Sequence, residues 1–470
     1  MAREEKRRAT GGGVILFLSN RETDVGGLLT SVICERTRLI DELFTGYSGP
    51  PFAIRMWDGW YWRSSEARPV CTVVVRSPEA LETLLLRPSE IALGEAFLAN
   101  EIDVEGDIFA VFGMEQRLVA SGQGLKRRVV EALLQLFQSF RSYCRTGRKH
   151  SPARDGAAIS QHYDQPAAFY RPWLGKSMVY SCAYFRSAED DLDTAQFNKL
   201  DLICRKLRLR REDRFLDIGC GWGSLVLHAA EHYGVYASGV TISSEQAEVA
   251  QTRIEQAALT QSSRVELTDY RRTKERLGEF EKIASVGMFE HVGPDHLPEY
   301  FRTVHELLRP GGVFLNHGIA RAQKARFRGP RLVDALDSPL LRRIPLLRKL
   351  RDPSFIDKYV FPDGELATIT QAVQAAEQAG FEVRDVENLR EHYERTLRLW
   401  VEGLRVNAAT LLNLVSETTY RTWLLYMAGC AAAFRRGEIA VYQMLLSRPD
   451  GGRSALPMTR EDWYRPVVRY

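Results

Sequence analysis

The chain has 470 residues, of which 45% are hydrophobic and 26% are charged. This length exceeds what one ordinary hydrophobic core holds, so we expect a globular protein with two domains. The formal net charge of +4 is small for this length and gives no reason to expect a nucleic-acid partner.

The cysteines and the apolar runs indicate the compartment. Seven cysteines are scattered without a Cys-x-x-Cys pair, which fits a reduced cytoplasm better than a disulfide framework and offers no metal-ligand spacing. No stretch reaches about 18 apolar residues without charge, the length that crosses a bilayer. We therefore expect a cytoplasmic protein that does not cross a membrane, although it can touch one.

The first third of the chain predicts a small domain. Residues 1–20 have the composition of a disordered lead. Asp58-Gly59 is a hairpin-turn signal between two runs of alternating apolar and polar residues, and short helical runs follow. Residues 21–144 are therefore predicted to form a small α+β domain. Residues 145–159 are basic and aperiodic and contain glycine, proline and serine, so we expect a linker there.

From residue 160 strand patterns alternate with helical patterns. The strand-like runs are RFLDIG, VYASGVTIS, VELTDY, KIASVGMF and GVFLNHGIA, and the helical runs are SLVLHAAEHY, SEQAEVAQTRIEQAAL and FRTVHELLR. This alternation predicts an α/β fold with a parallel, doubly wound, Rossmann-like sheet, which binds ligands at the carboxyl ends of its strands. We assign residues 160–450 to this second domain and 451–470 to a C-terminal tail.

A glycine-rich loop joins the first of these strands to its helix. It reads Asp217-x-Gly219-x-Gly221-x-Gly223, and glycines there let the backbone approach a ligand beside the free N–H groups of a helix N-terminus. The loop resembles the first motif of class I S-adenosylmethionine (SAM) methyltransferases, where it holds the methionyl part of the cofactor. The alternative is an ordinary tight turn between strand and helix.

The next two strand ends carry polar side chains suited to the rest of the cofactor. Thr241 and Gln246 can hydrogen-bond ribose hydroxyls in place of the usual acidic residue. One of Ser243 and Ser244 is expected to be the N-cap of the following helix. Asp269 ends the third strand and is a candidate acceptor for the adenine amino group.

Four further segments each offer a reactive side chain. These are Cys182 in YSCAYF, Glu290 and His291 in FEHVG, His317 in NHGI and Tyr359 in KYVFPDG. Singly, each has an ordinary structural explanation, because a buried cysteine usually packs as a small hydrophobe and a histidine at a strand end usually serves as a hydrogen-bonded structural group. Since all are expected at one edge of one cofactor sheet, we expect them to converge on a common site.

These strings in this order resemble a known family. QHYD, FYRPWLG, MVYSCAYF, FLDIGCGWG, GVTIS, GMFEHVG and KYVFP look like cyclopropane-fatty-acid-phospholipid synthases, to which the mycolic acid cyclopropane synthases are related. The resemblance runs from about residue 50 to residue 447. It implies a class I SAM-methyltransferase sheet with helical additions, and an N-terminal domain for lipid capture or homodimer contacts.

The resemblance also implies a reaction. The π bond of a cis double bond in a phospholipid acyl chain attacks the methyl of SAM, a base removes a proton from the added methyl, and a cyclopropane ring closes. In the family that base is bicarbonate, held by residues that match Cys182, Glu290, His317 and Tyr359 and by a backbone contact near Ile319. A nucleophilic role for Cys182 is the weaker alternative, because no activating base is evident.

The same match assigns residues around the cofactor and the cation. Tyr180 and Ser181 should contact the methionyl end, Gly219, Gly221, Thr241 and Gln246 should line the cofactor, and Asp269 and Tyr270 should lie near the adenine. Water must be excluded around a carbocation, and aromatic faces attract it. Tyr180, Tyr184, Phe185 and Phe289 are the expected walls.

This chain departs from the family at two places. Gly318 stands where the family usually has threonine after the histidine, which puts the product outcome in question. Residues 320–353 form a long insertion that carries ten Lys or Arg against three Asp among leucine, isoleucine and phenylalanine. Such a basic amphipathic segment is typical of a surface that binds anionic lipid headgroups, and a solvated loop is the alternative.

Three rival functions remain open on the sequence alone. Loss of a proton elsewhere would give a methylene- or methyl-branched acyl chain from the same cofactor and cation. A SAM methyltransferase for a polar small molecule lacks an evident base for its substrate. A lipid-binding scaffold has no need of a complete cofactor loop.

Overall fold

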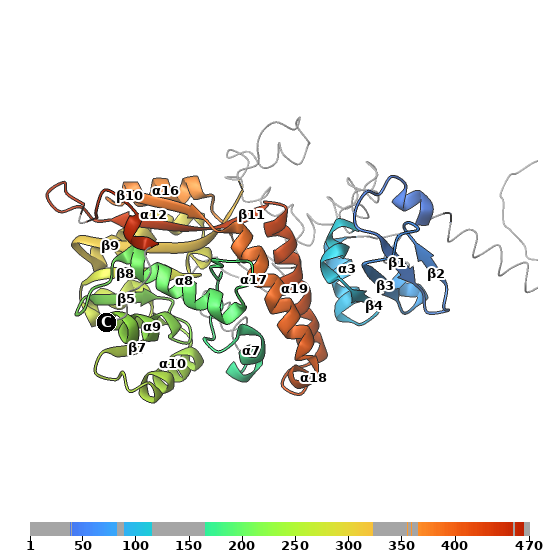
Figure 1. Cartoon of the computed structure of the whole chain (residues 1–470), viewed down its shortest axis with the longest axis horizontal. Coiled ribbons are helices and arrows are strands. Elements are labelled where there is room, and N and C mark those ends of the chain that lie inside the picture. The colour runs from blue at the N-terminus through green and yellow to red at the C-terminus, as the bar shows by residue number, and fades with distance from the viewer. Residues whose placement is uncertain are drawn as a thin grey trace, which may run out of the picture. The chain divides into compact units, whose positions relative to one another are not determined.

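Figure 1 shows the computed structural model of the chain. It describes residues 38, 40–81, 89–114, 165–322, 355, 359, 365–454 and 456–464. The predicted lead, the predicted linker and residues 323–353 of the basic insertion lie outside these residues. The chain divides into two compact units, residues 1–48 and 49–470. In the first unit residues 40–44 are helical, and the second unit contains both sheets.

A small four-stranded sheet precedes the main one. Its strands are β1 (Phe52–Arg55), β2 (Tyr61–Arg63), β3 (Cys71–Val75) and β4 (Ile102–Gly106), in the order β2-β1-β3-β4. β1 and β2 pair antiparallel around the predicted turn, where Gly59 has a φ of +86°. Helix α3 (Glu90–Leu98) lies between β3 and β4 in the chain and is capped by Ser89, and η1 (Ile108–Ala110) follows β4. The predicted α+β character of this region is confirmed.

The main sheet has seven strands. They are β5 (Arg214–Ile218), β6 (Tyr236–Thr241), β7 (Ser263–Leu267), β8 (Phe280–Val286), β9 (Leu308–Arg321), β10 (Glu382–Asn388) and β11 (Ile439–Ser447). Their order is β10-β11-β9-β8-β5-β6-β7, and β11 alone runs antiparallel to its two neighbours. The predicted doubly wound α/β sheet is therefore confirmed, with one antiparallel strand that the sequence did not predict.

Helices flank this sheet. They are α7 (Ala167–Leu174), α8 (Leu192–Leu207), α9 (Ser224–Tyr233), α10 (Ser244–Gln256), α11 (Thr273–Leu277), α12 (Leu297–Leu307), α16 (Ile369–Gln378), α17 (Arg390–Val406), α18 (Ala408–Leu411) and α19 (Glu417–Arg435). Short 3₁₀ turns are η2 (Tyr270–Arg272), η3 (Phe289–His291), η4 (Pro294–His296) and η6 (Glu461–Trp463). The helix starts follow capping chemistry: Ser243 accepts a hydrogen bond from the backbone N–H of Gln246, so it is the predicted N-cap of α10.

Three clusters of buried apolar side chains hold these elements together. One packs α8 and α9 against the sheet, a second packs α12 and α16 against it, and the third is rich in aromatic rings from α7, α17 and α19. In the third cluster the rings of Tyr180 and Trp400 lie 5.3 Å apart between centroids. This cluster therefore anchors the YSCAYF segment beside the carboxyl ends of the strands.

The end of the described chain docks on α8. Trp463 in η6 is 2% exposed, and its ring lies 5.3 Å from Nζ of Lys206 and 5.4 Å from the guanidinium carbon of Arg208. Among the helices that the structure describes, none has the length and apolar character that crossing a membrane requires.

Candidate active site

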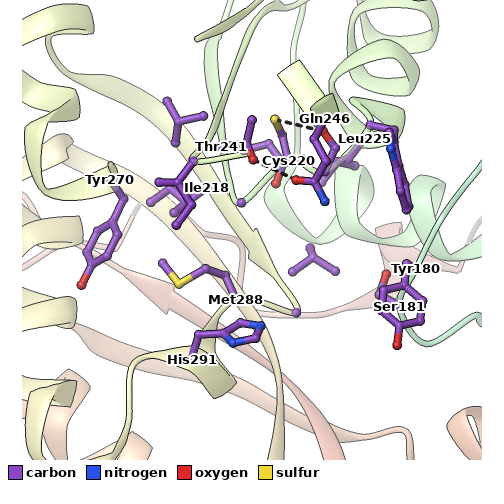
Figure 2. A pocket seen from close by; sticks show the side chains of 18 of the residues that line it. Tyr180, Ser181, Ile218, Cys220, Leu225, Thr241, Gln246, Tyr270, Met288 and His291 are labelled. Atoms are coloured by element: carbon purple, nitrogen blue, oxygen red, sulfur yellow. Dashed lines mark hydrogen bonds between the residues drawn. The ribbon is translucent and has the colours of Figure 1, made fainter. Parts of the chain in front are cut away.

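A cavity opens at the carboxyl ends of β5, β6 and β8, where the fold predicts a ligand (Figure 2). All nine residues predicted to bind the cofactor line it: Tyr180, Ser181, Asp217, Gly219, Gly221, Thr241, Gln246, Asp269 and Tyr270. They come from four separate segments of the chain. The fold therefore brings to one cavity the residues that the sequence predicts as cofactor ligands.

The glycine loop forms the floor of this cavity. Gly219, Gly221 and Gly223 have φ angles of +76°, +52° and +80°, a left-handed conformation that residues with a Cβ rarely adopt. A Cβ built at Gly221 meets no atom within 4 Å, so the space above this glycine is open. The loop is tied down because the N–H groups of Gly219 and Cys220 both donate to the carbonyl of Val240. Its backbone is thus held ready for close approach by a ligand.

Asp217 and Lys199 place two buried ionisable groups on the cavity wall. Asp217 is 3% exposed, and its Oδ1 has no hydrogen-bond partner among the described residues. Burial raises the pKa of this carboxyl to about 7, and the ammonium of Lys199 opposes part of the rise. Lys199 is 1% exposed, and its Nζ donates to Oγ of Ser181 at 3.0 Å. Burial lowers the pKa of Lys199 to about 8, although Cys182 and Asp217 act to raise it.

Thr241 and Gln246 form a bonded pair on another wall (Figure 2). The Thr241 hydroxyl donates to Oε1 of Gln246 at 2.8 Å. Because the amide oxygen already accepts this bond, the amide nitrogen is the group of Gln246 that is left to donate. The pair therefore offers a donor suited to a ribose hydroxyl oxygen.

Asp269 is already bonded within its own turn. Its carboxylate accepts a hydrogen bond from the backbone N–H of Arg271 at 2.9 Å. It also accepts from Nε and Nη2 of the Arg271 side chain, at 2.8 and 2.6 Å. Burial alone would raise the pKa of Asp269, but these hydrogen bonds hold it below its usual value. An adenine amino group would therefore have to share this carboxylate with Arg271.

The predicted catalytic residues do not line this cavity. Glu290 lies in η3, just after β8, and its Oε1 accepts from the backbone N–H of Ile319 at 2.8 Å. Its Oε2 is buried and has no partner in the described part of the chain. Burial raises the pKa of Glu290 to about 7, while the hydrogen bonds from the backbone act to lower it. This carboxyl therefore exchanges its proton near neutral pH.

His317 lies on β9, two residues before Ile319, so both side chains leave the same face of the sheet. It is 1% exposed, and its Nδ1 lies 3.2 Å from the amide nitrogen of Gln443, its register partner on β11. Its Nε2 is buried without a partner among the residues described here. Burial, together with Lys199 and Lys206, lowers the pKa of His317 to about 3, so the ring is neutral. If the amide donates to Nδ1, Nε2 carries the proton.

Cys182 is completely buried. Its thiol donates to the carbonyls of Ala183 and Leu389, at 3.2 and 3.8 Å. Burial raises the pKa of this thiol far above its usual value, although Lys199 acts to lower it, so Cys182 is a neutral donor rather than a thiolate nucleophile.

Tyr359 is tied to a different part of the protein. Its hydroxyl donates to Oε1 of Glu95 in α3 at 2.7 Å, so this proton is committed to the N-terminal domain. The structure thus joins Glu290 to Ile319 directly and places His317 on the same strand. The hydroxyl of Tyr359 instead donates to Glu95, which lies in the N-terminal domain.

Two residues at the site were not predicted. Lys199 occupies the buried face of α8 with Ala195, Leu202 and Lys206, at helical spacing. A lysine within an apolar stripe signals a buried charge that needs a partner, and this signal was present in the sequence. Gln443 gave no comparable signal, because its role depends on the pairing of β11 with β9.

Comparison with known proteins shows the family to which this chain belongs. A family model described as mycolic acid cyclopropane synthetase matches residues 150–444, and one described as a domain of unknown function matches residues 39–121. A probable fatty acid methyltransferase of Pseudomonas putida is 39% identical over 417 residues, which cover 88% of this chain and 96% of the relative. The cyclopropane-fatty-acyl-phospholipid synthase of Escherichia coli (strain K12) is 37% identical over 288 residues, which cover 61% of this chain and 67% of the relative.

Solved structures agree. The cyclopropane synthase MmaA2 from Mycobacterium tuberculosis matches with a TM-score of 0.54 and 32% identity, over 64% of this chain and 100% of that one. The mycolic acid cyclopropane synthase CmaA1, solved in complex with S-adenosylhomocysteine (SAH) and CTAB, matches with a TM-score of 0.54 and 34% identity. The match covers 62% of this chain and 98% of that one. Since the first family model covers more than half of the sequence and these folds coincide with the sheet described above, the chain belongs to the mycolic acid cyclopropane synthetase family of SAM-dependent methyltransferases.

Proposed function

We propose that this enzyme transfers a methylene group from SAM to the cis double bond of an unsaturated acyl chain in a membrane phospholipid, forming a cyclopropane ring. The observation that carries the proposal is Glu290, a buried carboxyl with one unpartnered oxygen that lies beside the cofactor cavity on the carboxyl edge of the sheet. Methylation of a polar substrate gives no reason to bury such a group in an apolar surrounding.

The cavity residues fit SAM. The unpartnered oxygen of Asp217 and the open space above Gly221 suit its amino acid part, and the amide nitrogen of Gln246 suits the ribose. Bound there, SAM supplies an electrophilic methyl group on sulfur. The chain's own contribution is to orient that methyl toward the acyl chain and to exclude water.

Cys182, Glu290, His317, Ile319 and Tyr359 are the proposed bicarbonate residues. The buried atoms without partners in the described structure, Oε2 of Glu290 and Nε2 of His317, suit a small polar group that both donates and accepts. Bicarbonate would supply the base that takes a proton from the added methyl. Three protein groups must give up bonds to join it. The thiol of Cys182 donates to backbone carbonyls, Ile319 donates to Glu290, and Tyr359 donates to Glu95.

Of the four aromatic walls predicted for the carbocation, two have a ring face that already contacts another side chain. The ring of Phe185 lies 4.1 Å from the guanidinium carbon of Arg395, so its face already holds a cation. Tyr184 stacks on His392, with ring centroids 4.7 Å apart. Tyr180 lines the cofactor cavity and Phe289 lies next to Glu290, so these two are placed best.

A second outcome of the same chemistry is a methylene- or methyl-branched acyl chain. Two points favour keeping it. The resemblance to the family implies a threonine where this chain has Gly318, and the relative from Pseudomonas putida is named a probable fatty acid methyltransferase. Incubation with SAM and vesicles of unsaturated phospholipid, followed by mass spectrometry of the acyl chains, tests the proposal. A gain of one methylene is expected, and NMR signals of ring protons then distinguish a cyclopropane from a branch. No gain, with SAM bound, would reject both products.

Binding of SAM should be linked to ionisation of Asp217. Because the pKa of Asp217 is raised to about 7, the free protein holds a proton there at pH 6, whereas an ammonium ligand requires the carboxylate. Affinity is therefore expected to fall about tenfold per pH unit below about 7, with about one proton released per SAM bound. Calorimetry in buffers of different ionisation enthalpy measures this release. Release that persists in Asp217→Asn would refute the assignment.

We further propose that the enzyme acts in the cytoplasm, on the surface of an anionic membrane, with the N-terminal domain serving lipid capture or homodimer contacts. The basic insertion is the expected docking segment. Charge reversal is made at Arg342, Arg343, Arg348 and Lys349. The control reverses four exposed arginines elsewhere: Arg211, Arg264, Arg302 and Arg435.

In liposome co-sedimentation at low salt, the insertion variant should lose most of its binding to anionic vesicles, since each basic residue near the surface contributes about 1 kcal/mol. The control should lose clearly less. Equal binding of the insertion variant and the wild type would contradict this role.

A further inference from the structure

Lys199 is a buried cation that the proposed reaction does not use. It comes from the middle of α8, is 1% exposed, and lines the cofactor cavity together with Ser181 and Asp217. An isolated buried ammonium costs several kcal/mol unless something compensates its charge. One protein bond is described for its Nζ, the 3.0 Å hydrogen bond to Oγ of Ser181. An ammonium has three hydrogens to donate, so this bond leaves capacity for a ligand.

The bond to Ser181 also directs the serine hydroxyl. Because Oγ of Ser181 accepts from Lys199, its own hydrogen must point elsewhere, and Ser181 lines the same cavity. Lys199 and Ser181 therefore form a paired donor for an anionic oxygen. Asp217, whose Oδ1 lacks a partner within the described structure, offers an acceptor on the same cavity.

An α-amino acid end carries a carboxylate and an ammonium on one carbon, which is the complement of this arrangement. We propose that Lys199, with Ser181, binds the carboxylate of the methionyl group of SAM, while Asp217 faces its ammonium. This inference rests on the SAM-binding part of the proposed function and is independent of whether the product is a cyclopropane.

A competing role is charge balance for the proposed bicarbonate. Lys199 is close enough to Cys182 and His317 to lower the pKa of both groups. The contacts favour the cofactor, however, because Lys199 bonds Ser181 and lines the cavity, whereas Cys182 and His317 do not line it.

The test compares two ligands that differ only in the carboxylate: S-adenosylhomocysteine (SAH) and its decarboxylated analogue. Calorimetry gives both dissociation constants for wild type and for Lys199→Met. Loss of a charged hydrogen bond predicts about 10- to 100-fold weaker binding of SAH to the variant. Binding of the decarboxylated analogue should change by less than about threefold. Lys199→Gln, which keeps a neutral donor, provides the same comparison if the methionine variant does not fold.

Lys206→Met is the matched control. Lys206 is also fully buried on α8, but it pairs with Asp385 and Glu387 and does not line the cavity. This variant should leave the affinity ratio of the two ligands unchanged.

Two results would overturn the assignment. Equal weakening of both ligands by Lys199→Met would make Lys199 a purely structural residue. If Lys199→Met bound SAH as the wild type does but needed more bicarbonate for turnover, Lys199 would instead belong to the proposed bicarbonate site. A wild-type enzyme that does not bind SAH at all would reject the proposed function together with this inference, whereas tight binding without a carboxylate preference rejects the role of Lys199 alone.

Discussion

Replacing Glu290 with glutamine is expected to lower kcat by about 10²- to 10⁴-fold, the range that a positioned general base contributes, because the variant would no longer hold the proposed bicarbonate base in place. SAH affinity should stay within about twofold. The glutamine oxygen can still accept from the N–H of Ile319, as Oε1 does at 2.8 Å. The amide nitrogen, however, puts a donor where the buried Oε2 offers an acceptor. Turnover of phospholipid vesicles and calorimetry with SAH measure the two effects.

The control is Glu266→Gln, on β7, which removes a carboxylate that pairs with Arg276 and does not line the cavity. This variant should keep wild-type turnover. If Glu290→Gln abolished SAH binding, Glu290 would belong to the cofactor site and the role given to it would be wrong.

The same carboxyl predicts how turnover depends on pH. Burial raises the pKa of Glu290 to about 7, above its ordinary value, so in acid the carboxyl is protonated and its free oxygen, Oε2, presents a hydrogen-bond donor where the carboxylate presents an acceptor. Turnover at saturating SAM should therefore rise with pH through about 7 in the wild type. Residual turnover of Glu290→Gln should lack this rise.

Replacing Gly318 with threonine is expected to destabilise this protein by about 1–3 kcal/mol, the usual cost of overpacking a core. A Cβ built at Gly318 lies 2.7 Å from Cδ1, 2.9 Å from Cβ and 3.0 Å from Cγ of Phe289. Gly318 lies between His317 and Ile319, and the clashing ring precedes Glu290. Turnover should therefore fall by more than the loss of folded protein explains, because displacement of Phe289 also moves the neighbouring Glu290. Denaturant unfolding and vesicle turnover measure both.

Phe289→Ala provides the matched test, because it removes the ring atoms that approach Gly318. In a double-mutant cycle the paired variant should be less destabilised than the sum of the two single variants. Additive effects would show that threonine is accommodated without contact with Phe289, and Gly318 would then carry no information about this site.

The cofactor side of the site was predictable because it depends on local chain order. Asp217, Thr241 and Asp269 each follow a strand, and a parallel sheet brings strand ends to one edge whatever the remaining packing. The cap at Ser243 was predictable for the same reason, since it involves residues three apart. The hydrogen bonds between Asp269 and Arg271 also join residues that are close in the sequence. Competition between Arg271 and an adenine amino group for this carboxylate could therefore have been predicted.

The rest depends on contacts between distant segments. Cys182 bonds the carbonyl of Leu389, 207 residues away, and Tyr359 bonds Glu95, 264 residues away. No periodicity specifies such pairs. The pairing of Gln443 with His317 likewise follows from the antiparallel insertion of β11 between β9 and β10, which the alternation of strands and helices does not predict. Whether Tyr359 joins the proposed anion site thus stays a prediction.

The origin of the lost proton distinguishes ring closure from the other fates of the carbocation. SAM carrying a fully deuterated methyl group is incubated with the enzyme and unsaturated phospholipid, and the acyl chains are analysed by mass spectrometry and deuterium NMR. Deprotonation of the added methyl followed by ring closure predicts that two of the three deuterons are retained, as a CD₂ group in a cyclopropane. A product that keeps all three deuterons, or that carries its CD₂ group on an alkene, would contradict the account.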